Sequence, residues 1–375
     1  MKNKYAIKYS TLIYFLYPFV ILYSYIIFSI GFNNFNLALI WDSFFYSDFY
    51  FNYKSGFIRR GLDGAIIYYL ASLTNFNPLI LQKTINLISF IIFIFLAIRI
   101  IAKNRVIPVF YFFSTSCFLL YIEYIMFGIR KDHLMILYFF VIIEIYKSKI
   151  NPIFKYVFLN LISIVATLSH EVFFIVFIFP IILLFFYSSW KKIFVLVPSL
   201  IIFFLTLIFN GNAENKQVIL ESWHQLGIDN IRFNVGLFSY PIYIWRLGLT
   251  PLEYVGFILT LLCNLYFLII SLSLKIVIDK QIVFFIIMQY LMCLSLCIVG
   301  CDFSRWIFFT NISIILTLMA LPNIVHHSPS KIYTSKILLI IFFYFFINFP
   351  FVGWDYNSFI NKIPIKMIYN FIFAF

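Results

Sequence analysis

The sequence predicts an all-α fold, a polytopic bundle of about eleven transmembrane helices. Of the 375 residues, 64% are hydrophobic and only 11% are charged, whereas soluble domains carry about 25% charged residues. Apolar runs of about 20 residues, long enough to cross a bilayer as a helix, recur from end to end. Runs such as 87–98, LISFIIFIFLAI, are apolar on every side and lack the alternation of β-barrel strands. We therefore expect the whole chain, 1–375, to form a single integral membrane domain.

The first apolar segment indicates how the chain enters the membrane. Lys2, Lys4 and Lys8 precede it, and its apolar part is too long for a cleaved signal peptide. We therefore expect a membrane anchor with its N-terminus in the cytoplasm. The predicted spans are 11–32, 84–102, 106–125, 131–146, 152–169, 172–188, 193–210, 251–273, 281–299, 306–323 and 337–354.

The positive charges support this orientation. Cytoplasmic loops of membrane proteins are enriched in Lys and Arg, and each loop that the expected topology places inside contains them. These residues are Lys103 and Arg105, those within 147–155, Lys191 and Lys192, Lys275 and Lys280, and Lys331 and Lys336. The net charge of +13 is thus explained mainly by topology, and we expect membrane lipids and no nucleic acid as partners.

Two long loops are predicted outside, at 33–83 and 210–250. Within the first, the apolar stretch 65–73 is too short to span a bilayer, and it is predicted to lie in the interface or to re-enter. The second loop is aromatic and sparsely charged between 221 and 249. Because Trp and Tyr favour the depth of the headgroups, both loops are expected at the outer membrane surface.

The first loop contains the densest group of external charges, Asp42, Asp48, Lys54, Arg59 and Arg60. Lys54 and the arginine pair suit a phosphate or diphosphate, because a guanidinium makes two parallel hydrogen bonds to such a group. Asp42 and Asp48 suit the acceptance of a proton from a sugar hydroxyl. The alternative is that these charges pair with one another and hold the loop on lipid headgroups.

Two further groups of ionisable residues lie at predicted outer ends of spans. Arg130, in FGIRKDH (127–133), is expected on the same face as His170 and Glu171, and a histidine suits proton transfer near neutral pH. Asp302 and Arg305 form the third group, three residues apart. The alternatives are a capped helix end for His170 and a simple ion pair for the third group. We predict no metal site and no cofactor.

The chain resembles the O-antigen and exopolysaccharide polymerases of the Wzy and EpsG-like type. The resemblance rests on FGIRKDHLMI (127–136), on ATLSHEVFFIVFIFP (166–180) about 40 residues later, and on KSGFIRRGLDG (54–64). Lys131 stands where the family pattern has a glutamine. The number of spans and the long external loops are also similar.

The resemblance implies a metal-independent glycosyltransferase of lipopolysaccharide or capsule biosynthesis in the bacterial inner (plasma) membrane. Such an enzyme transfers a growing glycan from undecaprenyl diphosphate to a new repeat unit at the periplasmic face. Its partners would be the lipid-linked oligosaccharide and a chain-length regulator protein. Arg130 and His170 are the residues that match the family motifs.

Other functions stay open at this point. A glycosyltransferase of the GT-C type would use Asp42 or Asp48 as its base and a lipid-monophosphate sugar donor. A flippase or transporter would place charges inside the bundle, for which Glu123 and Glu144 are the candidates. A non-catalytic assembly partner would not need cations gathered on one face.

Overall fold

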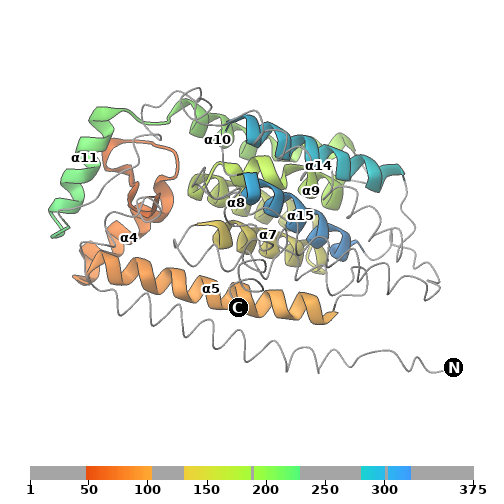
Figure 1. Cartoon of the computed structure of the whole chain (residues 1–375), viewed down its shortest axis with the longest axis horizontal. Coiled ribbons are helices and arrows are strands. Elements are labelled where there is room, and N and C mark those ends of the chain that lie inside the picture. The colour runs from red at the N-terminus through yellow and green to blue at the C-terminus, as the bar shows by residue number, and fades with distance from the viewer. Residues whose placement is uncertain (1–47, 104–130, 187–189, 229–279, 300–302, 322–375) are drawn as a thin grey trace, which may run out of the picture. The chain divides into compact units, whose positions relative to one another are not determined.

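The structure is a computed structural model that describes residues 48–103, 131–186, 190–228, 280–299 and 303–321 (Figure 1). In these ranges all regular secondary structure is helical, which confirms the all-α prediction. Among the described helices, two segments are long and apolar enough to cross a membrane, Pro152–Ser169 and Trp190–Ile208. The predicted spans 11–32, 106–125, 251–273 and 337–354 lie outside the described residues.

Most of the remaining predicted spans correspond to single helices of the structure. They are α5 (Pro78–Lys103), α7 (Asp132–Lys147), α8 (Pro152–Ser169), α9 (Val172–Phe186), α14 (Lys280–Val299) and α15 (Phe303–Ala320). The segment predicted at 193–210 differs, because it begins as a 3-10 helix, η4 (Trp190–Leu196), and continues as α10 (Val197–Ile208). Of these helices, α5, α9, α14 and α15 contain shorter apolar stretches of 10–17 residues.

The predicted loops also contain helices. The interfacial stretch predicted at 65–73 is part of α4 (Gly61–Thr74), and the second loop contains α11 (Ala213–His224). Helix α11 begins with a capping box, in which Asn212 and Asn215 each accept a hydrogen bond from the other's backbone N–H. The first loop ends earlier than predicted, since α5 starts at Pro78.

The chain divides into two compact units. In the first unit, α8 packs against α7 and α10, α5 packs against α7, and α4 packs against both α5 and α8. Asn160 of α8 ties that helix to the segment before and within α10. Its Nδ2 donates to the carbonyl of Val195 (2.8 Å) and its Oδ1 accepts from Ser199 (2.9 Å). In the second unit, α14 packs against α15.

Helix α8 carries its apolar side chains outward and its small polar ones inward. Ile153 is 69% and Phe154 is 58% exposed, whereas Ser163 and Thr167 are fully buried. The outward residues of α10, among them Ile201 and Phe204, are also apolar. Soluble proteins rarely expose contiguous apolar surfaces of this kind, so the distribution favours a membrane location.

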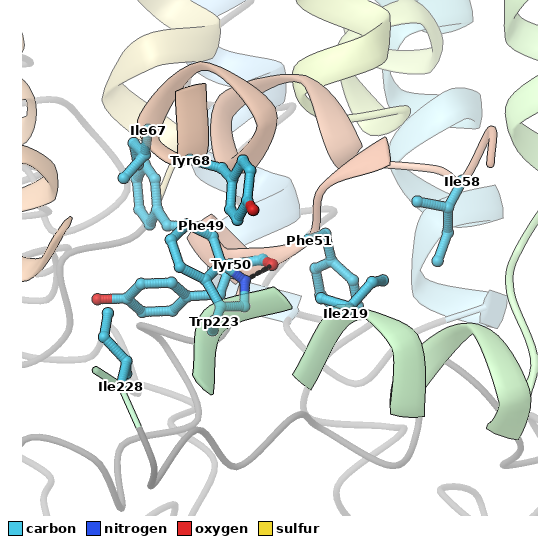
Figure 2. Close-up of a cluster of buried hydrophobic side chains, with 9 residues drawn as sticks. All are labelled: Phe49, Tyr50, Phe51, Ile58, Ile67, Tyr68, Ile219, Trp223 and Ile228. Carbon is cyan, nitrogen blue, oxygen red and sulfur yellow. Dashed lines mark hydrogen bonds between the residues drawn. The ribbon is translucent and has the colours of Figure 1, made fainter. Parts of the chain in front are cut away.

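Residues of the two predicted loops form one aromatic cluster within the first unit (Figure 2). The indole N–H of Trp223, in α11, donates to the carbonyl of Tyr50 (2.7 Å), and its ring lies edge-on to the rings of Tyr50 and Tyr68. The complete cluster comprises Phe49, Tyr50, Phe51, Ile58, Ile67, Tyr68, Ile219, Trp223 and Ile228.

Polar bonds surround this cluster and join the same segments. Asn52 donates to Ser222 (3.0 Å), and Asn215 donates to the carbonyl of Ser55 (3.1 Å). Helix α4 lies so close to the chain before it that a Cβ at Gly64 would stand 1.9 Å from the carbonyl oxygen of Phe51. Only glycine allows this approach, and the approach fixes the start of α4, where Arg60 lies.

Candidate functional site

A two-point ion pair joins the first loop to the turn between α8 and α9. Arg60 donates from Nε to both carboxylate oxygens of Glu171, at 2.8 and 3.1 Å, and from Nη2 to Oε1 at 2.5 Å. The Arg60 side chain is 15% exposed and that of Glu171 is 8% exposed. Such planar, two-point pairing is the strongest form of a carboxylate contact and is specific to arginine.

A second ion pair lies beside the first and is more deeply buried. The ammonium of Lys131 stands 2.8 Å from Oδ2 of Asp63, and the Lys131 side chain has no exposed surface. Ser169 donates its hydroxyl to the same Asp63 oxygen at 2.6 Å. Lys131 also donates to the backbone carbonyls of Arg60 and Ser169, at 3.2 and 3.3 Å. The lysine therefore holds both segments that carry the Arg60–Glu171 pair.

The backbone of Arg60 is itself unusual. This residue precedes the first turn of α4 with φ of 59° and ψ of 12°, the left-handed region. A non-glycine residue in this region is strained and persists only where its surroundings fix it. Here the Lys131 bond to the Arg60 carbonyl and the side-chain pairing with Glu171 supply that constraint.

His170 is buried next to the pair. Its Nδ1 accepts a hydrogen bond from the backbone N–H of Val172 (3.3 Å) and lies 3.7 Å from Glu171 Oε2. The same residue ends helix α8, and its own N–H donates to the carbonyl of Ala166. His170 thus fixes the geometry of the turn that presents Glu171.

The charges around Glu171 favour its ionised form. Burial by itself raises the pKa of the Glu171 carboxyl. The Arg60 guanidinium outweighs this effect with help from His170 and Arg59, so that the pKa lies well below its usual value. Glu171 is therefore a poor proton acceptor for as long as Arg60 holds it.

The structure brings together part of the predicted set of site residues. Arg60, His170 and Glu171 lie in one place, and the positive charge of Arg59 acts on Glu171. Lys54 is exposed, and its ammonium lies over the rings of two residues of α4, 4.7 Å from the centre of Tyr68 and 5.7 Å from that of Tyr69.

Two more of the predicted site residues lie in described helices. Asp48 begins the short 3-10 helix η1 (Asp48–Tyr50), and Arg305 lies in the first turn of α15. Asp42, Arg130 and Asp302 lie outside the described residues.

Two charged residues of the site, Asp63 and Lys131, are not among the predicted site residues. Both lie within the strings that carry the resemblance, where Lys131 is a departure from a glutamine and also one of the cations expected on the outer face. A usable signal was present for Asp63, because it lies three residues after Arg60 in RRGLDG and so falls within the same helical turn. Its partner Lys131 is 68 positions away in sequence, and no local pattern joins the two.

Among the described residues, no group of three or more His, Cys, Asp or Glu side chains is arranged to hold a metal ion. Comparison with protein-family models, with curated proteins and with solved structures gives no match for this chain.

Proposed function

We propose that the chain is a membrane glycosyltransferase that polymerises the repeat units of an O-antigen or capsule, with an undecaprenyl-diphosphate-linked glycan as donor. One observation carries this proposal. The strings 54–64, 127–136 and 166–180, which carry the resemblance to the polymerases, contribute residues to the same charged site. Arg60 comes from the first string, Lys131 from the second and Glu171 from the third.

The residues of the site suit the chemistry of such a transfer. The hydroxyl of the acceptor sugar attacks the anomeric carbon, and the bond from this carbon to the diphosphate breaks with its electron pair on the departing phosphate. Cations stabilise the charge that develops there, and Arg60 and Arg59 are the candidates. No metal ion is required, because the guanidinium groups supply the positive charge.

The topology that accompanies this function is also part of the proposal. About eleven spans would cross the bacterial inner membrane, with a cytoplasmic N-terminus and with 33–83 and 210–250 in the periplasm. The contacts of Trp223 with Tyr50 and of Asn215 with Ser55 favour this arrangement, because they require both loops on one side of the membrane. A chain-length regulator is the expected protein partner.

The GT-C type of glycosyltransferase is a second candidate, because α4 follows the acidic part of the first loop as an interfacial helix would. That enzyme would use Asp42 or Asp48 as its base and a lipid-monophosphate donor. A transporter is less well supported. Glu144, one of its two candidate interior charges, is exposed in the last turns of α7.

The length distribution of the polysaccharide made by living cells tests the proposal. The variant is expressed in cells from which the chromosomal gene has been deleted. With Arg60→Ala these cells should produce lipid A core with a single repeat unit, because the departing diphosphate loses its principal cation. The exposed Lys192, on the predicted cytoplasmic side, provides the matched control, and Lys192→Ala should give the full ladder.

Two other outcomes of this experiment would contradict the polymerase. A full ladder from Arg60→Ala at wild-type abundance would remove the cation site from the reaction. Complete loss of product from Asp42→Asn or Asp48→Asn, with the ladder of Arg60→Ala intact, would favour the GT-C enzyme instead, because an amide cannot accept the proton.

A further inference from the structure

The site contains two carboxylates that differ in how they are held. Asp63 is bonded to Ser169 and to Lys131, whose side chain is completely buried. Glu171 is held by Arg60, whose side chain has 15% of its surface exposed. An anion that approaches this site therefore meets Arg60, and the carboxylate that it displaces is Glu171.

We propose that Arg60 and Glu171 form a masked base: an anionic lipid diphosphate takes the guanidinium from the carboxylate, and the released Glu171 accepts the proton of the attacking hydroxyl. The inference rests on the proposed function and adds to it the identity of the base and the event that activates it. His170 is then a positioning residue, because its Nδ1 is engaged by the backbone N–H of Val172.

Competition for the same donors makes this exchange possible. The Nε and Nη2 groups of Arg60 form two parallel hydrogen bonds to Glu171, and a phosphate group offers oxygens with matching geometry and a larger charge. The diphosphate therefore replaces the carboxylate at the donors that the carboxylate occupies. Lys131 continues to hold the carbonyl of Arg60 during the exchange, so the arginine turns its side chain without moving its backbone.

The exchange changes the proton affinity of Glu171 in the direction that catalysis needs. While Arg60 is paired with it, the pKa of the Glu171 carboxyl is well below the usual range. When Arg60 turns to the diphosphate, burial continues to raise this pKa and the largest opposing charge has gone. The smaller effects of His170 and Arg59 on this pKa remain.

The atoms balance in the resulting step. The O–H bond of the acceptor breaks and its proton moves to a Glu171 oxygen. The new bond from that hydroxyl oxygen to the anomeric carbon forms, and the lipid diphosphate leaves with the electron pair. When the lipid diphosphate departs, Arg60 returns to the carboxylate, lowers its pKa again and expels the proton to water. The site is then reset.

Binding of a donor analogue to the full-length protein in phosphatidylcholine nanodiscs tests the exchange without requiring turnover. The probe is farnesyl diphosphate. In the Glu171→Gln variant the neutral amide no longer competes for Arg60, so the probe should bind about tenfold more tightly than to the wild type. Transfer should fall by about 10² to 10⁴-fold, as for a lost general base. A purely structural residue would not improve binding while it reduces the rate.

Infrared difference spectra give an independent readout. Addition of farnesyl diphosphate to the wild type should shift a carboxylate stretching band, because Glu171 loses its two-point pairing with Arg60 and stays ionised, and Glu171→Gln should abolish this shift. Glu144→Gln, at an exposed glutamate of α7, is the matched control and should keep this shift. Should Glu171→Gln fail to accumulate, Glu171→Asp takes its place. The aspartate side chain is one methylene shorter and should hold Arg60 less well, so this variant should bind the probe more tightly and retain part of the activity.

The results separate this inference from the proposed function. Equal affinity of the wild type and Glu171→Gln for the probe, absence of binding to either, or absence of the carboxylate shift overturns the masked base, even in cells that make a normal ladder. A full ladder from Glu171→Gln also overturns it and leaves the polymerase intact. Tighter binding to Glu171→Gln and the carboxylate shift, in a protein whose deletion does not alter the ladder, would retain the exchange and refute the polymerase.

Discussion

Gln289 of α14 donates from Nε2 to the backbone carbonyl of Val176 in α9, at 3.0 Å. Val176 lies four residues before Pro180, which has no N–H to offer to that carbonyl. The other hydrogen bond of the same amide nitrogen goes to Ser313 of α15. One side chain thus satisfies the carbonyl that a proline frees inside an apolar helix, and it joins α9, α14 and α15 of the second unit.

This relationship predicts a coupled pair of substitutions. Gln289→Leu should lower the free energy of unfolding by about 1–3 kcal/mol, because it leaves a buried carbonyl without a donor. In a Pro180→Ala background the helix supplies its own N–H at position 180, and the cost of Gln289→Leu should be smaller. Thermal unfolding of the wild type, the two single variants and the double variant in detergent measures the coupling. If Gln289→Leu lowers the free energy of unfolding equally with and without Pro180→Ala, the coupling is contradicted.

The Lys131–Asp63 pair predicts a second coupling. Lys131→Met leaves the Asp63 carboxylate buried and without its cation, which typically costs about 3–5 kcal/mol. Adding Asp63→Asn removes the stranded charge and keeps an acceptor for Ser169, so the double variant should accumulate to a higher level than Lys131→Met alone. Membrane abundance by immunoblot is the measurement. A double variant less abundant than either single one would argue that the charge of the pair is not what stabilises this region.

The Arg60–Glu171 pair predicts opposite pH dependences. In the wild type the pKa of Glu171 is lowered on folding, so the pair stabilises the protein above the unfolded glutamate pKa of about 4.3 and is lost as pH falls through the folded value. In Arg60→Gln, burial should raise this pKa above the unfolded value. A group whose pKa is raised on folding destabilises the folded state as pH rises. The loss in free energy of unfolding caused by Arg60→Gln should therefore be larger at pH 7 than at pH 5.

Thermal unfolding at the two pH values checks this prediction. The control is the double variant with Arg60→Gln and Glu171→Gln. Its loss in free energy of unfolding should be the same at both pH values, because the titrating group is gone. A pH-dependent deficit that persists in the double variant would assign the titration to another residue, with His170 as the nearest candidate.

The predicted orientation of the membrane segments is testable by fusion. Alkaline phosphatase, which is active only outside the cytoplasm, should be active when fused at Asn215 and inactive at Lys191. The reverse pattern would invert the topology. Activity at both positions would place both ends of α10 on one side and exclude this segment as a span.

The sequence predicted the helices well where their limits depend on apolar length, as for α8 at 152–169. It misplaced the start of α5, because Gln82 and Lys83 resemble loop residues. In the fold both are buried, and the Tyr50 hydroxyl donates to Gln82 at 2.6 Å. A polar side chain that has a distant partner can lie inside a helical bundle, and composition alone does not reveal the partner.

The residues of the candidate site were predictable in part, but their pairing was not. Arg60, His170 and Glu171 were predicted as site residues because they are ionisable residues beside apolar segments on the predicted outer face. Ionisable residues are costly at such positions and are commonly functional. The pairing partners were not predictable. Arg60 and Glu171 are 111 positions apart, and the sequence contains several carboxylates that could equally have been paired with that arginine.

The bonds between Tyr50 and Trp223, Asn52 and Ser222, and Ser55 and Asn215 have a consequence for engineering. Segments 49–58 and 213–228 form one structural unit, although about 155 residues separate them in sequence. A chimera that imports only one of them would lose all three bonds and would disturb Arg60, which lies two residues after the first segment. A chimera that keeps this region folded would have to take both segments from the same donor protein.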